Sequence, residues 1–289
     1  MTHSPLRNDA DPDWRAMHLA AQAEEASLAQ ALRLAFAALL GRVALLRLRQ
    51  ALQAGDIESA MQAVPVGQLL LVRPLIEAAL ARTAAAGARI AQASAIVRLG
   101  PGSIAQAEVA FWARTRSAGL VVGVTEQTRQ ALRKAIAESL TASLSRAELA
   151  RRVEVIVGLS KPQVAALLNR ADELVERGLA VTKRQAILER YAAQLRRQRA
   201  QVIARHELMQ AANEGRRLQW EREARDGLIA PDRWEREWVA VMHDNRTCPY
   251  CIDADGTRAP LNGVYPNGSD GPPGHVICRC TENLVRRSA

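Results

Sequence analysis

The sequence predicts a mainly α-helical fold that ends in a small α+β module stapled by zinc. Hydrophobic residues make up 48% of the chain but aromatic residues only 3%, so the core must be built from aliphatic residues, of which alanine and leucine are strong helix formers. Apolar residues also recur at helical spacing through the first two thirds. After Gly227 the composition changes to Gly, Pro, Asn and Asp, and all four cysteines follow.

These composition changes predict four consecutive regions. Residues 1–15 are polar and form a flexible leader, and residues 16–102 form an N-terminal region of extended helices. A helical middle region covers residues 103–227, and the zinc-stapled module covers residues 228–289. The boundary near residue 102 rests on Leu99-Gly-Pro-Gly102, since glycine and proline interrupt helices.

Two helical runs are predicted in the N-terminal region. The first runs from residue 16 to Ala54, with Gly55 as its C-cap and Asp56 as the N-cap of the next helix. Its apolar residues repeat at spacings of four and three: Leu32, Phe36, Leu39, Val43 and Leu46. Pro65 breaks the pattern, and the second run covers Leu75–Arg98.

Neither a signal peptide nor a membrane span is predicted. Met1–Arg15 has no apolar segment. The most apolar stretch, Leu34–Gly41, is flanked by Arg33 and Arg42 and is far shorter than the roughly 20 residues a spanning helix needs. We therefore expect synthesis in a reducing cytosol, where clustered cysteines indicate metal ligands before disulfides.

Three shorter helices are predicted in the middle region. The first covers Thr125–Leu140, with the threonine as its N-cap. Ser145-Arg-Ala-Glu148 fits a capping box that opens a helix to Val157. Ser160-Lys-Pro-Gln163 fits a second capping box, and its helix ends near Gly178.

A long basic helix is predicted over residues 182–213. Apolar residues recur at every seventh position: Val181, Leu188, Leu195, Val202 and Met209. This stripe fits either packing within the chain or self-association. On the polar side, one acidic residue, Glu189, stands against seven basic residues: Lys183, Arg184, Arg190, Arg196, Arg197, Arg199 and Arg205. Such a run is either a solvated face or a surface that meets DNA or an acidic partner, and the net charge of +9 fits both interpretations.

The C-terminal module opens with a predicted strand over Trp238–Met242. The remaining segment is too poor in apolar residues to build a conventional core, so it needs a crosslink, such as a metal ion or disulfides, to stay folded. His243, at the end of this strand, is expected at the surface.

The cysteines can supply that crosslink as metal ligands. Cys248 and Cys251 are separated by two residues, as in a tight metal knuckle, and His275 and Cys278 have the same gap. With Cys280 there are five candidates for four positions around one ion. On an extended strand Cys278 and Cys280 would point to opposite faces, which favours the set without Cys280; an all-cysteine set stays open if the segment around Arg279 turns.

Zinc is the expected ion, because it accepts mixed sulfur and nitrogen ligands in tetrahedral geometry. Disulfides between such near neighbours would be strained. Five candidate ligands for four coordination positions indicate a closed, structural metal site. The sequence contains no His-Glu-x-x-His metalloprotease motif, no deaminase motif, no phosphate-binding loop and no nucleophile elbow. We therefore predict that the protein is not an enzyme.

The order of motifs in the last third resembles a known family. The motifs are Arg205-His-Glu207, Asn213 with Gly215, Trp238, Asp244-Asn-Arg-Thr-Cys-Pro-Tyr-Cys251, Gly256 and Pro273-Gly-His-Val-Ile-Cys-Arg-Cys280. This pattern, over Ala204–Leu284, is similar to that of phage Mu F-like minor head proteins, grouped with head-morphogenesis proteins of the phage SPP1 type. A weaker likeness extends back to Ser103. One departure is Val276, where the family often has proline.

The resemblance implies a minor capsid protein, a structural virion component inside the head near the portal, with the portal protein, the major capsid protein and packaged DNA as partners. We expect one group of residues to clamp helix and knuckle together: Arg205, Glu207, Asn213, Asp244 and Arg246. Two alternatives from other classes remain. One is a cytosolic zinc-ribbon DNA-binding module, and the other is a zinc enzyme or toxin remnant.

Overall fold

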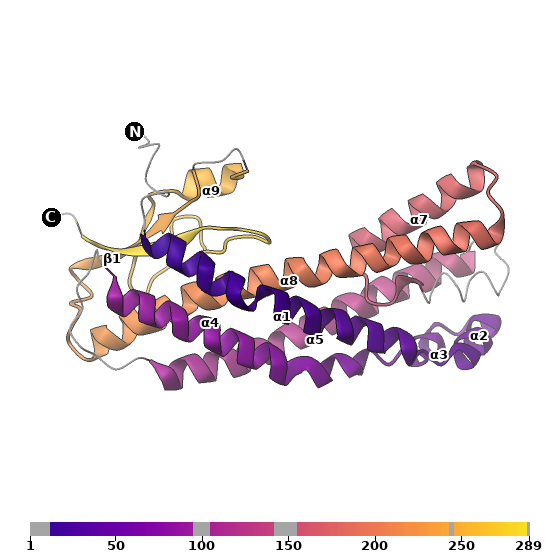
Figure 1. The fold of residues 1–289 in the computed structure, drawn as a ribbon, viewed down its shortest axis with the longest axis horizontal. Coiled ribbons are helices and arrows are strands. Elements are labelled where there is room, and N and C mark those ends of the chain that lie inside the picture. Colours follow the sequence, from indigo (N-terminus) through magenta and orange to yellow (C-terminus); the bar gives the residue numbers. More distant parts are fainter. Residues whose placement is uncertain (1–11, 95–104, 142–154, 243–245, 288–289) are drawn as a thin grey trace. The chain divides into compact units, whose positions relative to one another are not determined.

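The fold is mainly helical, as the composition predicts. The computed structural model describes residues 12–94, 105–141, 155–242 and 246–287. It is 71% helical and contains one three-stranded sheet near the C-terminal end (Figure 1). The prediction of helices followed by a small α+β module is therefore confirmed.

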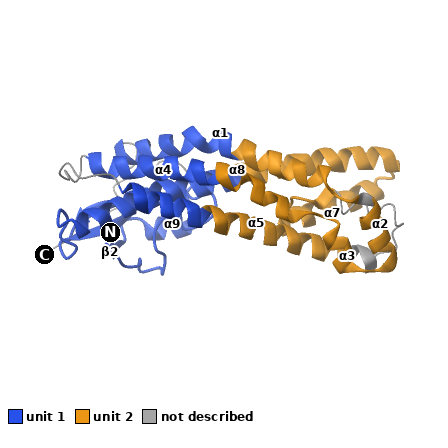
Figure 2. Cartoon of the chain, turned by 90° about the horizontal axis from the view of Figure 1, so that it is seen from below, with its two compact units in different colours: residues 1–28, 76–116, 202–289 blue, residues 29–75, 117–201 orange. Residues whose placement is uncertain are grey.

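The chain forms two compact units, each assembled from separate segments (Figure 2). Unit 1 contains residues 1–28, 76–116 and 202–289. Unit 2 contains residues 29–75 and 117–201. The four consecutive regions of the sequence analysis stay a prediction, since the units combine segments from several of them.

The first predicted helix is interrupted. Helix α1 covers Pro12–Gly41 and α2 covers Leu45–Ala54, so the single helix expected to reach residue 54 is wrong. The cap predictions are confirmed. Gly55 takes the left-handed conformation with φ of 69°, and Asp56 caps α3 (Ile57–Gln62) through its side chain. Helix α1 begins inside the predicted leader, whose first eleven residues lie outside the described part.

A 3₁₀ helix, η1 (Val66–Val72), follows Pro65 and leads into α4 (Arg73–Ala93). By length and composition, the stretch Ile57–Ala93 could cross a membrane. Helix α4 nevertheless buries a full face of small and aliphatic residues, as core helices of folded proteins do, so the stretch is weak support for a span. The predicted boundary at Leu99–Gly102 lies outside the described residues.

Helix α5 covers Gln106–Thr141 without a break. The prediction that Thr125 caps a separate helix is therefore wrong, because this threonine lies in the middle of α5. The capping box at Ser160 is confirmed: its side chain and that of Gln163 bond reciprocally at the start of α7 (Lys161–Glu176). The other predicted capping box, Ser145–Glu148, lies outside the described residues.

Helix α8 covers Val181–Arg225, twelve residues further than predicted. In unit 1 it packs closely against α4 at two glycines. A Cβ atom on Gly215 would lie 1.8 Å from the carbonyl oxygen of Ala84, and one on Gly87 would lie 2.1 Å from that of Ala212. The absence of side chains at both glycines therefore allows the two backbones to meet.

The C-terminal module contains a three-stranded antiparallel sheet in the order β2-β1-β3. The strands are β1 (Trp234–Val239), β2 (Arg258–Pro260) and β3 (Thr281–Arg286), and α9 (Pro249–Ala254) follows β1. The predicted strand is displaced, because β1 begins four residues before Trp238 and ends before Met242.

The module has a small core in which the cysteines take part. Its buried members are Trp238, Ala240, Cys251, Ala254, Ala259, Tyr265, Cys278 and Cys280. Beside them lies a buried polar group. Arg236 donates to Glu282 at 2.9 Å, and the Tyr265 hydroxyl donates to the same carboxylate oxygen at 3.0 Å. With so little aliphatic surface, the sulfur atoms are a substantial part of what the core contains.

Candidate metal centre

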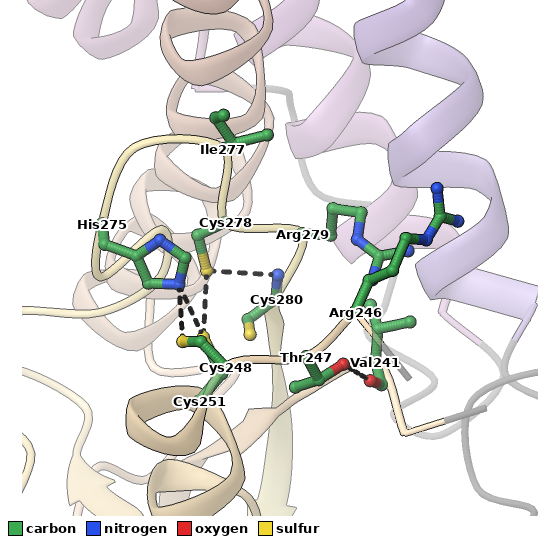
Figure 3. A pocket seen from close by; sticks show the side chains of 10 residues that line it. All are labelled: Val241, Arg246, Thr247, Cys248, Cys251, His275, Ile277, Cys278, Arg279 and Cys280. Carbon is green, nitrogen blue, oxygen red and sulfur yellow. Dashed lines mark hydrogen bonds between the residues drawn. The ribbon is translucent and has the colours of Figure 1, made fainter. Parts of the chain in front are cut away.

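The five predicted ligands meet at one place in unit 1 (Figure 3). Cys248 is the N-cap of α9, and Cys251 lies in its first turn. His275 and Cys278 come from the loop before β3, and Cys280 directly precedes that strand. All four cysteines are free thiols, so no disulfide competes for them.

The separations between ligand atoms suit a shared ion. The His275 Nε2 lies 3.0 Å from the Cys251 Sγ and 3.1 Å from the Cys248 Sγ. The Sγ atoms of Cys251 and Cys278 are 3.6 Å apart. Ligand atoms around a tetrahedral ion at bond lengths of about 2.0–2.3 Å lie roughly 3.3–3.8 Å from one another. The sulfur–sulfur separation falls in this range, and the two nitrogen–sulfur separations are a few tenths of an ångström shorter. This donor set can therefore hold a metal ion.

Cys280 belongs to the cluster, contrary to the expectation that it would point away from Cys278. Its sulfur lies within 4.8 Å of those of Cys251 and Cys278, and its amide donates to the Cys278 Sγ at 3.5 Å. The prediction assumed an extended strand, but β3 begins only at Thr281, so neither cysteine lies in a strand. A turn with Ile277 at a positive φ of 67°, closed by a 3.1 Å bond from the Cys278 amide to the His275 carbonyl, directly precedes them. The cluster has one ligand more than a four-coordinate ion needs.

The histidine ring is oriented for ligation. Its Nδ1 lies 2.8 Å from the backbone carbonyl of Val276, so this nitrogen carries the proton and the Nε2 lone pair faces the sulfurs. Metal-binding histidines are commonly fixed by such a bond from the second ring nitrogen. Burial lowers the pKa of His275, but hydrogen bonds to Val276 and Cys251 outweigh it, and the net shift is upward.

The thiol pKa values diverge within the cluster. A hydrogen bond from Cys280, joined by one from His275, lowers the pKa of Cys251 to about 5. The pKa of Cys278 is also lowered, mainly by Cys280. The hydrogen bonds with both neighbours, together with burial, raise the pKa of Cys280. Cys251 is thus prepared as a thiolate, the form that binds metals.

The predicted clamp residues contact different segments of unit 1. Asn213, on α8, donates to the Cys280 carbonyl at 3.3 Å and so ties this helix to the metal loop. Arg205 and Glu207 instead pair with helices: Arg205 with Glu25 of α1, at 2.9 Å, and Glu207 with Arg116 of α5, at 2.7 Å. Their expected pairing with the module is corrected accordingly. Arg246 lines the metal site, and Asp244 lies outside the described residues.

Sequence analysis missed the contribution of α1. The ring nitrogens of Trp14 and His18 lie 3.3 and 3.0 Å from the carbonyl oxygen of Arg279, in the metal loop. The two rings also contact each other, with centroids 4.1 Å apart and planes tilted by 39°. More than 260 residues separate the partners in sequence, and no local pattern in the sequence signals such a contact.

Two of the arginines predicted to meet DNA bind other residues of unit 2. Arg199 is buried and donates to the Thr128 hydroxyl at 3.1 Å and the Gly158 carbonyl at 2.9 Å. Arg196 donates to the carbonyls of residues 155 and 157. Burial lowers the pKa of both guanidinium groups to about 10. The burial of Arg199 argues against its expected contact with DNA, whereas Arg196 is half-buried and uses one guanidinium nitrogen for the two carbonyls.

The predicted residues that stay at the surface of α8 are Lys183, Arg190 and Arg197, with Arg184 half-buried. The Nε of Arg190 donates to its own helix at the Ala186 carbonyl. These four residues retain the expectation of a contact with DNA or an acidic partner.

A family model for phage Mu protein F like proteins matches residues 130–282, which is more than half of the chain. The chain belongs to this family. The match contains all five candidate ligands and the whole of α8. The family resemblance inferred from the motifs is therefore confirmed, and the weaker likeness expected back to Ser103 is matched from residue 130 onward. The phage Mu F-like family consists of structural phage head proteins concerned with head morphogenesis.

The first 129 residues lie outside the matched range, including Trp14 and His18 of α1. No curated protein and no solved structure matches the chain. The role of α1 at the metal loop therefore rests on the geometry of this chain alone.

Proposed function

We propose that this protein is a minor capsid protein, a structural component of the phage head that lies inside the head near the portal. The observation that carries the proposal is the meeting of five metal ligands within the segment that the phage Mu F-like family model covers. The portal and major capsid proteins are the expected partners, and the host cytoplasm is the expected site of synthesis. In this role the metal acts on folding, and no reaction is assigned to the chain.

We further propose that the ion is zinc and that its site is closed. Three thiolates with one imidazole, or four thiolates, are ligand sets that zinc accepts in structural sites. Five candidates for four positions leave no need for water as a ligand. The described residues that line the site include no carboxylate to act as a general base. A catalytic zinc site, by contrast, keeps a coordination position open.

The test is mass spectrometry of purified phage particles, combined with metal analysis of the isolated full-length protein. We expect the protein in particles in fewer copies than the major capsid protein, with about one zinc per chain. Absence of the protein from particles contradicts the head assignment. Isolated protein that is folded but holds no metal contradicts the zinc assignment and leaves the head assignment standing.

The exposed basic residues of α8 support a contact with packaged DNA or with an acidic portal surface. Contacts between phosphates and Lys or Arg weaken steeply as salt increases, because binding releases counterions. We therefore expect duplex binding by the full chain to fall when salt is raised from about 50 to 200 mM. Binding that does not respond to salt contradicts the electrostatic contact.

A further inference from the structure

Four leucine side chains lie at the surface of one short stretch of unit 2. The stretch consists of α2, α3, η1 and the first turn of α4. The exposed fractions are 71% for Leu46, 57% for Leu70, 67% for Leu71 and 58% for Leu75, and we call these four residues the leucine surface. Single exposed leucines are common on folded proteins, but several within one stretch mark a surface that another molecule covers. The stretch precedes residue 130, where the family match begins.

The leucines are exposed because the other side of the same helices already fills the core. In α2, Leu48 and Leu52 are buried, whereas Leu46 faces solvent. In η1, Leu69 is buried and the two leucines that follow it are exposed. Turning either helix to bury the exposed leucines would bring buried ones into water. The chain therefore has no means of its own to cover this surface.

Two hydrogen bonds connect the start of α2 to the start of η1. The Ala44 amide donates to the Ala63 carbonyl at 2.9 Å, and the Arg42 side chain donates to the Gln68 side chain. Helices α2 and α3 also contact each other (Figure 1). The leucine surface begins two positions after Ala44 on α2 and two positions after Gln68 on η1, so its two parts are neighbours.

The charge beside the leucine surface is positive. Arg47 and Arg49 on α2 are exposed, and neither has an acidic partner among the described residues. The stretch contains two acidic residues, and both are already bonded. Asp56 caps α3, and Glu58 pairs with Arg133 of α5 at 2.6 Å. The surface thus combines apolar side chains with arginine charge and has no unengaged carboxylate of its own.

This composition favours a partner protein over the other molecules that could cover the surface. A second copy of the chain would bring arginine against arginine, which costs free energy. Nucleic acid would attract the arginines but leave the leucines uncovered. Membrane-surface helices use lysine and aromatic anchors, and residues 29–75 contain no Lys, Trp or Tyr. Protein interfaces, by contrast, are enriched in arginine and depleted in lysine around an apolar centre.

We propose that the leucine surface docks a partner protein that presents an apolar patch bordered by acidic residues. The partners to test are the portal protein and the major capsid protein, so for the identity of the partner this inference rests on the proposed function. The surface uses none of the metal ligands and none of the basic residues of α8. Docking, metal binding and the contact with DNA are thereby assigned to different residues, and they can be disrupted one at a time.

The test measures binding of the full chain to the purified portal protein and to the purified major capsid protein by biolayer interferometry. Leu70→Ser with Leu71→Ser removes apolar surface. The matched control is Val122→Ser with Val181→Ser, because these valines are 64 and 51% exposed in unit 2 but lie outside the stretch. We expect one of the two proteins to bind, the leucine variant to bind it about tenfold more weakly or worse, and the control to stay within about twofold of the parent.

A second pair of variants tests the charge. Arg47→Gln with Arg49→Gln should weaken docking by about three- to tenfold at low salt and by less at high salt, because attraction between exposed charges is screened. Arg190→Gln with Arg197→Gln removes the same charge from α8. It should leave docking unchanged and weaken duplex binding. The two pairs therefore separate docking from the contact with DNA.

Circular dichroism of each variant checks the fold. Both substituted leucines are more than half exposed, so the helical signal should equal that of the parent chain. If the first leucine variant loses helical signal, Leu46→Ser with Leu75→Ser replaces it, since these two side chains are exposed to a similar degree.

Four outcomes overturn the docking surface. One is that neither head protein binds the parent chain, and another is that both leucine variants bind as tightly as the parent. A third is a dimer of the parent in sedimentation equilibrium that the leucine variant dissociates. The fourth is binding to phosphatidylglycerol vesicles, but not to phosphatidylcholine vesicles, that depends on the leucines while neither head protein binds. None of these outcomes affects the head assignment, which depends on the particle analysis.

Discussion

Arg205 and Glu207 lie two positions apart on α8 and therefore face different surroundings. The Glu207 carboxylate is only 4% exposed and receives two hydrogen bonds from Arg116, at 2.7 and 2.8 Å. The Arg205 side chain is 51% exposed in its pair with Glu25. Charge-assisted hydrogen bonds to a buried group contribute more to stability than ion pairs at the surface, so the two residues should differ in their effects.

Replacing Glu207 with glutamine tests this difference. We expect the free energy of unfolding to fall by about 1.5–3 kcal/mol, because Arg116 loses its charged partner and a buried acceptor is weakened. Arg205→Gln is the matched control and should cost less than about 1 kcal/mol. Urea denaturation monitored by circular dichroism measures both. Equal losses in the two variants would contradict the burial argument.

His206, between these residues, gives the folded protein an acid-sensitive position. Burial lowers its pKa, an effect that the nearby Glu207 carboxylate only partly opposes, and its Nδ1 has no hydrogen-bond partner among the described residues. The unfolded chain therefore binds a proton at a higher pH than the folded chain does. It follows that stability is lost as pH falls below about 6.5, the ordinary pKa of histidine.

We expect the unfolding free energy to decrease more steeply between about pH 6.5 and 5 in the parent chain than in His206→Gln. The candidate metal ligands titrate in both proteins, so the difference between the two curves reports His206 together with its interaction with His275. Urea denaturation at a series of pH values, with zinc present throughout, provides the curves. Parallel curves for the two proteins would show that His206 is not the group responsible.

Helix packing in unit 1 depends on backbone contact between α4 and α8. At Gly87 and Gly215 there is no space for a Cβ atom, since the facing carbonyl oxygens lie 2.1 and 1.8 Å from where it would be. In an isolated helix alanine is favoured over glycine by about 1 kcal/mol. Steric exclusion at these positions should reverse that preference.

Gly215→Ala should therefore destabilise the protein by about 1–3 kcal/mol, or prevent unit 1 from folding. The control is Gly119→Ala in α5, where no atom lies within 4 Å of the added Cβ and stabilisation by about 0.5–1 kcal/mol is expected. Denaturant midpoints of the two variants give opposite signs if this is correct. A stabilised Gly215→Ala would mean that the two helices do not approach so closely.

At the scale of elements, the sequence predicted helix caps, which depend on neighbouring residues, but did not predict contacts between distant residues. The caps at Gly55, Asp56 and Ser160 depend on a few neighbouring residues, and they were predicted correctly. Thr125 was misassigned as a cap because threonine also occurs inside helices, where its hydroxyl can bond to the preceding turn. The nearby Thr128 does this, donating to the Val124 carbonyl at 2.8 Å.

At the candidate site, too, local features were predicted and long-range features were missed. The two-residue gaps of Cys248/Cys251 and His275/Cys278 are a local property, and they predicted that these residues would meet. The side favoured for Cys280 assumed an extended strand, whereas β3 begins only at Thr281, and strand boundaries depend on pairing with a distant segment. The burial of Arg199 depends on α5 and on the loop at Gly158, which no periodic pattern on α8 itself reveals.

At the scale of the molecule, the metal ligands all belong to unit 1, while unit 2 contains none of them. The module's small core contains three of the cysteines among its eight buried residues. The helices of unit 2 have their own aliphatic core, including Phe36, Leu132 and Leu167. Removal of the ion should therefore affect the two units unequally.

Treatment of the folded protein with a strong chelator tests this asymmetry. We expect faster amide hydrogen exchange across residues 234–286, because structural zinc contributes directly to folding. Exchange in α7 and in the first half of α8 should stay slow. Mass spectrometry of peptides reports both regions, and Cys251→Ser should reproduce the pattern without chelator. Uniform loss of protection, or none, would contradict a local structural ion.

The bonds from Trp14 and His18 to Arg279 impose an order on biosynthesis. Every segment of unit 2 has been translated once residue 201 is made, whereas unit 1 needs its earliest helix, its central segments and the loop beyond residue 270. During synthesis, Trp14 and His18 of α1 therefore cannot contact the metal loop until that loop has left the ribosome and bound the proposed ion. A nascent chain in a zinc-starved cell would expose this surface for longest, and there it would be a natural target for chaperones.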